Sequence, residues 1–229
     1  MSIYITGDTH GDISEFRGRL VRCRLSADDI LIITGDFGFD WDDFAISEWG
    51  SLRRPFTVLF CDGNHENFDI LNALETRRMF GSEVGVFGEN TYRLLSGRMY
   101  DIRGLKTFVF GGASSIDRGD REPGVSWWPE EIPSHAVFET ARQTLKDNGY
   151  TFDLFVSHTC DPETKKQVLK AGQLNFCDPV ENMIAMLEDE IRKNGGSYGR
   201  HYFGHFHEDV DIGDKHCLYN RVVPILEGT

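Results

Sequence analysis

Five short apolar segments, each followed at once by glycine or polar residues, constrain the fold of this 229-residue chain more than any other feature. The segments cover residues 3–6, 30–34, 57–61, 154–156 and 201–203. They are rich in Ile, Val and Phe, and their side chains do not alternate between apolar and polar. Such runs predict strands that are buried on both faces, as in a sheet covered by helices.

Helical patterns between these segments predict an α/β core. The clearest helix is expected at residues 179–194, because Asp178 is a natural N-cap, apolar residues recur at helical spacing and two glycines follow. Weaker patterns predict helices at residues 14–21, 42–49, 67–74 and 134–145. Asp40, Asp42 and Asp43 are expected to open the second of these helices, and Glu66 the third.

The second half of the chain predicts a further sheet and a long loop. Apolar stretches at residues 99–110 and 210–226 are typical of strands and turns. Residues 111–131 are rich in Gly, Arg and Trp and lack periodicity, which indicates a loop of the length that commonly carries function.

The polar residues that follow the five strands are mostly of one chemical kind, since they offer oxygen or imidazole nitrogen atoms. They are Asp8, His10, Asp36, Asn64, His158, His205 and His207. In an open α/β sheet the carboxyl ends of the strands lie along one edge, where ligands bind. Mixed carboxylate and imidazole donors suit manganese, iron or zinc better than calcium. Seven donors are too many for one tetrahedral site, so the pattern predicts two metal ions that share a bridging carboxylate.

Glycine precedes a candidate ligand in four of these segments, at Gly7, Gly35, Gly63 and Gly204. We expect glycine there because the backbone turns sharply as each strand ends.

The motifs Gly-Asp-Thr-His, Gly-Asp, Gly-Asn-His-Glu, Ser-His and Gly-His-Phe-His, in this order between residues 3 and 207, resemble those of the calcineurin-like metallophosphoesterases. The resemblance implies a single domain over residues 1–229 with an α/β fold, a four-layer αββα sandwich of two mixed β-sheets flanked by helices. It also implies that the chain hydrolyses phosphate esters at a dinuclear metal centre, with a bridging hydroxide as the nucleophile.

The resemblance also implies a role for each matching residue. Asp8, His10 and His207 would hold the first metal ion. Asn64, His158 and His205 would hold the second, and Asp36 would bridge the two. His65 would be the catalytic histidine that is not a ligand and assists the leaving group. We expect two divalent ions, with Mn²⁺ first and iron or zinc as alternatives.

One departure from the family pattern concerns phosphate binding. The protein Ser/Thr phosphatases of this superfamily carry Asp-Arg-Gly soon after the second motif, whereas here Asp36 is followed by Phe-Gly-Phe-Asp-Trp. Because this arginine is missing, the sequence does not favour protein phosphatase activity. We expect a substitute cation from the 111–131 loop, so the candidate substrate contacts are Asn64, His65, Arg118 and Arg121. Trp127 and Trp128 could form an apolar wall for a substrate, although packing the loop down is the simpler role.

The charge of the chain limits what it binds. With 37 acidic and 24 basic residues, the formal net charge is −13, which disfavours long duplex nucleic acid and anionic membranes. Two bound divalent ions would make the site itself positive, so a small phosphate ester is the expected partner. Two alternatives stay open: a nuclease-like phosphodiesterase acting on nucleotides or short RNA or DNA, and a non-catalytic scaffold that binds metal.

The cysteines and the apolar runs predict a cytoplasmic protein. The five cysteines form no Cys-x-x-Cys pair, so buried reduced thiols, Cys160 among them, are expected rather than disulfides or a zinc ribbon. The first residues leave no room for a secretory signal, and the apolar runs are too short to span a membrane.

Overall fold

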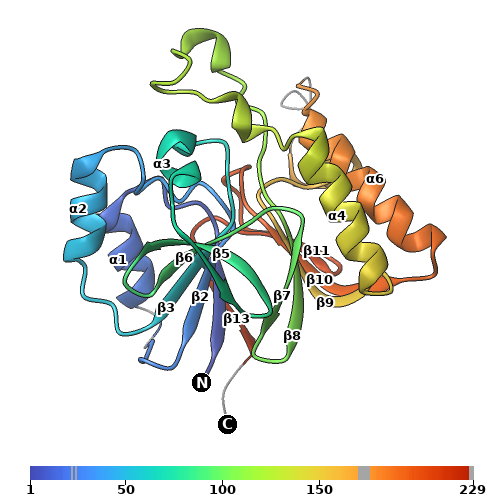
Figure 1. The fold of residues 1–229 in the computed structure, drawn as a ribbon, viewed down its shortest axis with the longest axis horizontal. Helices are drawn as coiled ribbons and strands as arrows, with labels where there is room; N and C mark the ends of the chain where they lie inside the picture. Colours follow the sequence, from blue (N-terminus) through green and yellow to red (C-terminus); the bar gives the residue numbers. More distant parts are fainter. Residues whose placement is uncertain (22, 24, 170–175, 227–229) are drawn as a thin grey trace.

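Two mixed β-sheets lie face to face at the centre of the molecule (Figure 1). The computed structural model describes residues 1–21, 23, 25–169 and 176–226. The first sheet has seven strands in the order β13-β1-β2-β3-β6-β5-β4. They are β1 (Ile3–Thr6), β2 (Ile30–Ile33), β3 (Thr57–Phe60), β4 (Thr76–Met79), β5 (Ser82–Gly88), β6 (Thr91–Leu94) and β13 (Val222–Leu226). Strands β1, β2, β3 and β6 run parallel, and the other three are antiparallel to their neighbours.

The second sheet has six strands in the order β11-β12-β10-β9-β8-β7. They are β7 (Arg98–Ile102), β8 (Leu105–Phe110), β9 (Thr151–Ser157), β10 (Ser197–Phe203), β11 (Val210–Ile212) and β12 (Lys215–Cys217). Its central strands β8, β9, β10 and β12 are parallel.

Helices cover the outer faces of the two sheets, which completes the four-layer arrangement (Figure 1). On the side of the first sheet lie α1 (Ile13–Val21), α2 (Asp43–Ser51) and the short α3 (Phe68–Asn72). The second sheet is covered by α4 (His135–Asp147) and α6 (Pro179–Lys193), with α5 (Pro162–Val168) before α6. The predicted αββα fold class is confirmed. In the part of the chain described, no helix is both long and apolar enough to cross a membrane.

The first strands bury both of their faces, as their unbroken apolar sequences predicted. On β2, Ile30 and Ile32 contribute to the core between the sheets, while Leu31 and Ile33 pack in a second core with Phe16 of α1. Because both faces are occupied, the register of these strands fixes where each strand ends. The residues that follow them are therefore held in place by the core.

Three features of the fold were missed or misjudged from the sequence. The strands β4, β5 and β6 were not predicted, and β4 is an edge strand with the exposed arginines Arg77 and Arg78 instead of an apolar run. Helix α5 was also missed, although Asp161 and Pro162 form a standard helix start. Helix α3 spans five residues only, shorter than the 67–74 expected.

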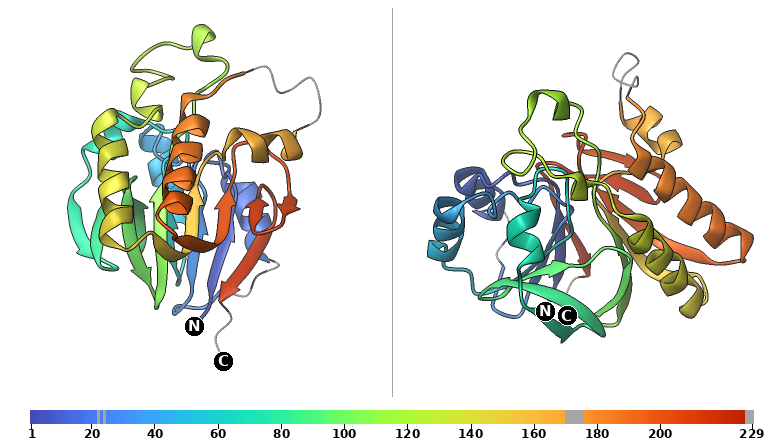
Figure 2. Two further views of the ribbon diagram at one scale, coloured as in Figure 1. Left: turned by 90° about the vertical axis from the view of Figure 1, so that its right-hand side faces the viewer. Right: turned by 45° about the horizontal axis from the view of Figure 1, so that its top comes forward.

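The 111–131 segment is irregular, as predicted, apart from the short 3₁₀ turns η1 (Arg118–Asp120) and η2 (Pro129–Glu131). Figures 1 and 2 show that it extends over the end of the molecule opposite the N-terminus. Since β1 begins beside the N-terminus, this is the end at which the parallel strands of the first sheet finish.

Candidate metal centre

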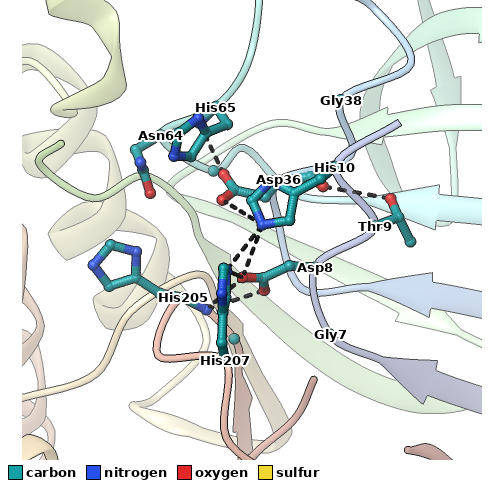
Figure 3. A network of polar contacts seen from close by, with 12 residues as sticks. Gly7, Asp8, Thr9, His10, Asp36, Gly38, Asn64, His65, His205 and His207 are labelled. Atoms are coloured by element: carbon teal, nitrogen blue, oxygen red, sulfur yellow. Dashed lines mark hydrogen bonds and ion pairs between the residues drawn. The ribbon is translucent and has the colours of Figure 1, made fainter. Parts of the chain in front are cut away.

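All seven candidate ligands lie at the carboxyl ends of parallel strands. Figure 3 shows them converging where the two sheets meet, apart from His158, which is not labelled there. Asp8 and His10 follow β1, Asp36 follows β2 and Asn64 follows β3. The second sheet contributes His158 after β9, and His205 and His207 after β10. The structure thus brings donors from five strands together, as expected.

One group of possible metal donors consists of Asp8, His10 and His207, whose ligand atoms all lie within 4.8 Å of one another. The Nε2 atoms of the two histidines are 2.9 Å apart, and His207 Nε2 is 3.3 Å from Asp8 Oδ2 (Figure 3). The ring of Tyr219 stacks on His207 with centroids 4.5 Å apart. Sequence reasoning missed Tyr219, because only the return of the chain after β12 places it there.

A second group consists of Asp8, Asp36 and His158, again within 4.8 Å. His158 Nε2 lies 3.2 Å from Asp36 Oδ1 and 3.0 Å from the side-chain oxygen of Asn64. The ring of His205 is close by, with its centroid 5.0 Å from that of His158. Burial lowers the pKa of His205 to about 3, so its imidazole is neutral and available as a donor.

The hydrogen bonds of His158 favour a cation beside its Nε2 atom. Its Nδ1 lies 2.8 Å from the carbonyl oxygen of Thr34 and donates to it, so the lone pair of a neutral ring is on Nε2. That lone pair faces the oxygen atoms of Asp36 and Asn64, both of which are acceptors. Burial disfavours a charged ring, but Asp36 and Asp8 outweigh it and raise the pKa of His158 to about 9. A positive charge, from a proton or a metal ion, is therefore strongly favoured at this point.

Asp36 faces both groups of donors. Its Oδ1 is next to His158, and its Oδ2 lies 3.7 Å from His10 Nε2. Burial opposes ionisation, yet the surrounding histidines, His158 first, hold the pKa of Asp36 well below its usual range. Asp8 also belongs to both groups. The geometry thus provides two adjoining donor sets with carboxylates between them.

The expected reason for the four glycines is wrong at three of them. Only Gly35 has a positive φ, of +91°. At the other three positions glycine is required by close approach: a Cβ would lie 2.0 Å from Asp8 Oδ1 at Gly204, 2.1 Å from Asp36 Oδ1 at Gly63 and 2.0 Å from the Leu218 carbonyl oxygen at Gly7. The glycines make room for the buried carboxylates and for the returning chain.

Four of the eight described non-glycine residues with a positive φ are candidate ligands. His10, Asp36, His205 and His207 have φ between +47° and +68°, a region that costs non-glycine residues about 1–2 kcal/mol each. Hydrogen bonds between loops hold this conformation, including those from His10 N to the Asp36 carbonyl oxygen, 2.8 Å, and from His205 N to Asp8 Oδ1, 3.0 Å. Such strain is concentrated at functional sites.

Glu66 does not open a helix, which corrects the prediction made for it. Asn67 is the N-cap of α3, and the fully buried Glu66 carboxylate accepts from the backbone N–H groups of Phe37, Gly38 and Gly63 at 2.9–3.2 Å. It therefore joins the loops that carry Asp36 and Asn64. No local pattern distinguishes this role from that of a helix-capping carboxylate.

The three aspartates around the start of α2 have different roles. Asp42 caps the helix by accepting from Ala45 N at 2.8 Å and Asp43 is its first residue, as predicted. Asp40 instead is fully buried and accepts from Asn67 N at 3.0 Å. Burial raises the pKa of Asp40 to about 7.

The long loop brings one arginine to the site and not the other. Arg121 Nη2 lies 3.1 Å from His65 Nε2, and the same nitrogen donates to Asp117 Oδ2 at 2.8 Å. Arg118 is exposed in η1. The backbone N–H of His65 donates to Asp36 Oδ1 at 2.8 Å. Burial, together with Arg121 and against the charge of Asp36, lowers the pKa of His65.

The two tryptophans of the loop differ in exposure. Trp128 is buried and its ring contacts Trp41 edge-on, with centroids 5.7 Å apart. It packs the loop down, whereas Trp127 is half-buried.

The model of the calcineurin-like phosphoesterase family matches residues 1–209, which is most of the chain. No curated protein sequence matches it.

Gly204→Ala is expected to disrupt metal binding, because the new Cβ would overlap Asp8 Oδ1. Overpacking of this kind destabilises a fold by about 1–3 kcal/mol. The measurements are Mn²⁺ content after loading and the thermal unfolding midpoint. Gly88→Ala is the control, since nothing lies within 4 Å of a Cβ at this strand residue. Equal metal content in the two variants would contradict the account.

Asp40→Asn is expected to reduce the pH dependence of stability. With its pKa raised from 3.8 to about 7, folded Asp40 retains a proton that the unfolded chain releases, so its contribution to stability falls as pH rises from 4 to 7. Each pKa unit corresponds to about 1.4 kcal/mol. Urea unfolding at pH 5, 6, 7 and 8 should show wild type losing stability relative to the variant. The exposed Asp43→Asn should show no such change, and a pH-independent difference for Asp40→Asn would refute the argument.

Proposed function

The chain belongs to the calcineurin-like phosphoesterase family, whose members are hydrolases of phosphate esters, and we propose that it hydrolyses a small phosphomonoester or phosphodiester at a dinuclear metal centre. The observation that carries the proposal is the pair of adjoining donor groups, which share Asp8 and have Asp36 between them. Convergence of so many lone pairs requires positive charge, above all at the fully buried group of Asp8, Asp36 and His158.

Each donor group would hold one metal ion. Asp8, His10 and His207 would hold one divalent ion, and Asn64, His158 and His205 the other, with Asp36 facing both. Bound divalent ions supply hydroxide near neutral pH and polarise phosphoryl oxygens. Carboxylate and imidazole donors together favour Mn²⁺, with iron or zinc as alternatives.

His65 is placed to act on the leaving group. Its backbone is fixed by Asp36, and its ring lies beside His10, with centroids 5.2 Å apart, without belonging to either donor group. To donate a proton to the departing oxygen, the imidazole would have to be protonated against the effects of burial and Arg121, which lower its pKa. General acid catalysis of this type contributes about 10²–10⁴-fold.

Arg121 supplies the cation that the sequence lacks after Asp36. Its guanidinium group lies against His65, and Asp117 holds it in place. A guanidinium fork donates to two oxygens of one phosphoryl group. The contact between Arg121 and His65 thus supports phosphate binding next to the proton donor, and it favours an enzyme over a metal-binding scaffold.

The net charge supports a small substrate, and the cysteines support a reducing compartment. The net charge of −13 opposes the approach of long polyanions. Cys61, Cys160 and Cys217 are buried thiols outside disulfides, which is the pattern of cytoplasmic proteins.

His65→Ala is expected to retain bound metal and to lose about 10²–10⁴-fold in turnover, the range of general acid catalysis. The assay is hydrolysis of aryl phosphate mono- and diesters by Mn²⁺-loaded protein, with metal content measured on the same samples. His135→Ala, at an exposed position on α4, is the matched control. Unchanged turnover in His65→Ala would remove His65 from the mechanism.

The same assay separates the alternatives for wild type. Removal of metal by a chelator should abolish hydrolysis, and Mn²⁺ should restore it. Bound metal without hydrolysis of either ester would favour a scaffold. Faster cleavage of dinucleotides or short RNA than of aryl esters would favour a nuclease-like phosphodiesterase.

A further inference from the structure

A chain of buried polar groups runs from Asn64 away from the metal centre to the base of the long loop. The side-chain nitrogen of Asn64 donates to Ser115 Oγ at 3.1 Å, and the Ser115 hydroxyl donates to Glu131 Oε2 at 2.6 Å. The other oxygen of Glu131 accepts from the backbone N–H of Ser115 at 2.9 Å. Ser115 and Glu131 are almost completely inaccessible to solvent, with exposures of 1% and 0%.

The direction of these bonds determines the orientation of the Asn64 amide. Glu131 accepts at both oxygens, so the single proton of the Ser115 hydroxyl is used on Glu131. The hydroxyl can then only accept from Asn64, which requires the NH₂ end of that amide. The oxygen end is thereby turned toward His158 Nε2, 3.0 Å away.

If the Asn64 amide were rotated by 180°, both of its ends would make unfavourable contacts. Its oxygen would face the Ser115 lone pairs, and its NH₂ group would point at the metal centre, where a cation requires an oxygen donor. A bound cation would itself favour the oxygen end, and the bond to Ser115 holds the amide in that orientation before the ion binds.

We propose that Ser115 and Glu131 are positioning residues that hold Asn64 with its oxygen facing the second metal ion. The proposal rests on the dinuclear centre proposed above and deepens it. It also gives the long loop a structural connection to the centre, because Ser115 and Glu131 lie at the start and the end of the segment that carries Arg121.

Backbone packing keeps the two ends of the loop together. Ala113 N donates to the Glu131 carbonyl oxygen at 3.1 Å, and a Cβ at Gly112 would lie 2.4 Å from that oxygen. Ser114 N donates to Asp178, the N-cap of α6, at 2.9 Å. The position of Ser115 is therefore fixed by its neighbours, independently of Asn64.

The test is a titration of metal-free protein with Mn²⁺, in which free Mn²⁺ is followed by electron paramagnetic resonance. Wild type should bind two ions. Ser115→Ala and Glu131→Gln should each weaken one of them by about 10–100-fold, the usual effect of losing a partner behind a metal ligand, and leave the other unchanged. Asn64→Ala identifies the affected ion, since it should weaken the same one.

Control variants and a double variant distinguish a positioning effect on Asn64 from a general loss of structure. Glu130→Gln, at an exposed neighbouring residue, and Ser114→Ala should bind both ions like wild type. Adding Ser115→Ala to Asn64→Ala should cause no further loss, because Ser115 acts on the metal ion only through the Asn64 side chain. Thermal unfolding of every variant shows that the fold is retained.

Three results would overturn the proposal: unchanged affinity in Ser115→Ala and Glu131→Gln, equal weakening of both ions, or additive losses in the double variant. Wild type that binds only one Mn²⁺ would overturn it as well. Binding is measured without a substrate, so two bound ions with no hydrolysis would refute the proposed function and leave the positioning result valid.

Discussion

The backbone N–H of His205 donates to both carboxylate oxygens of Asp8, at 3.0 and 3.1 Å, and so connects the end of β10 to the end of β1. Asp8 is fully buried, and Asp36, whose Oδ1 lies 3.2 Å from His158 Nε2, is 1% exposed. Two carboxylates that are buried side by side require compensating positive charge. The neighbouring groups are mostly imidazoles and backbone N–H groups, and this arrangement could hold a metal ion.

Much of the surrounding structure serves to hold these carboxylates and imidazoles close together. Glycines at positions 63 and 204 leave the volume that the carboxylate oxygens occupy. Glu66 accepts from three backbone N–H groups of two different loops, and four candidate ligands adopt left-handed backbone conformations. Strain of this kind persists only where the surroundings over-determine it, and here the fully buried strands on either side provide that support.

The features that were predictable from sequence are those with a local cause. Unbroken apolar runs identified β1, β2, β3, β9 and β10, and the residues after them identified the candidate ligands. The roles of Glu66, Tyr219 and Glu131 depend on contacts between segments distant in sequence, which leave no local pattern. The glycines show the difference most clearly: their presence before each ligand was visible, but the reason at Gly204 is an atom of Asp8, 196 positions earlier.

Anomalous X-ray diffraction from crystals of the Mn²⁺-loaded protein tests the central claim most directly, because it locates the metal ions without reference to activity. The account predicts two manganese peaks at the carboxyl ends of the strands. One should lie among Asp8, His10 and His207, the other beside His158 and the oxygen of Asn64, with Asp36 between them. A single peak, or peaks away from these residues, would contradict it.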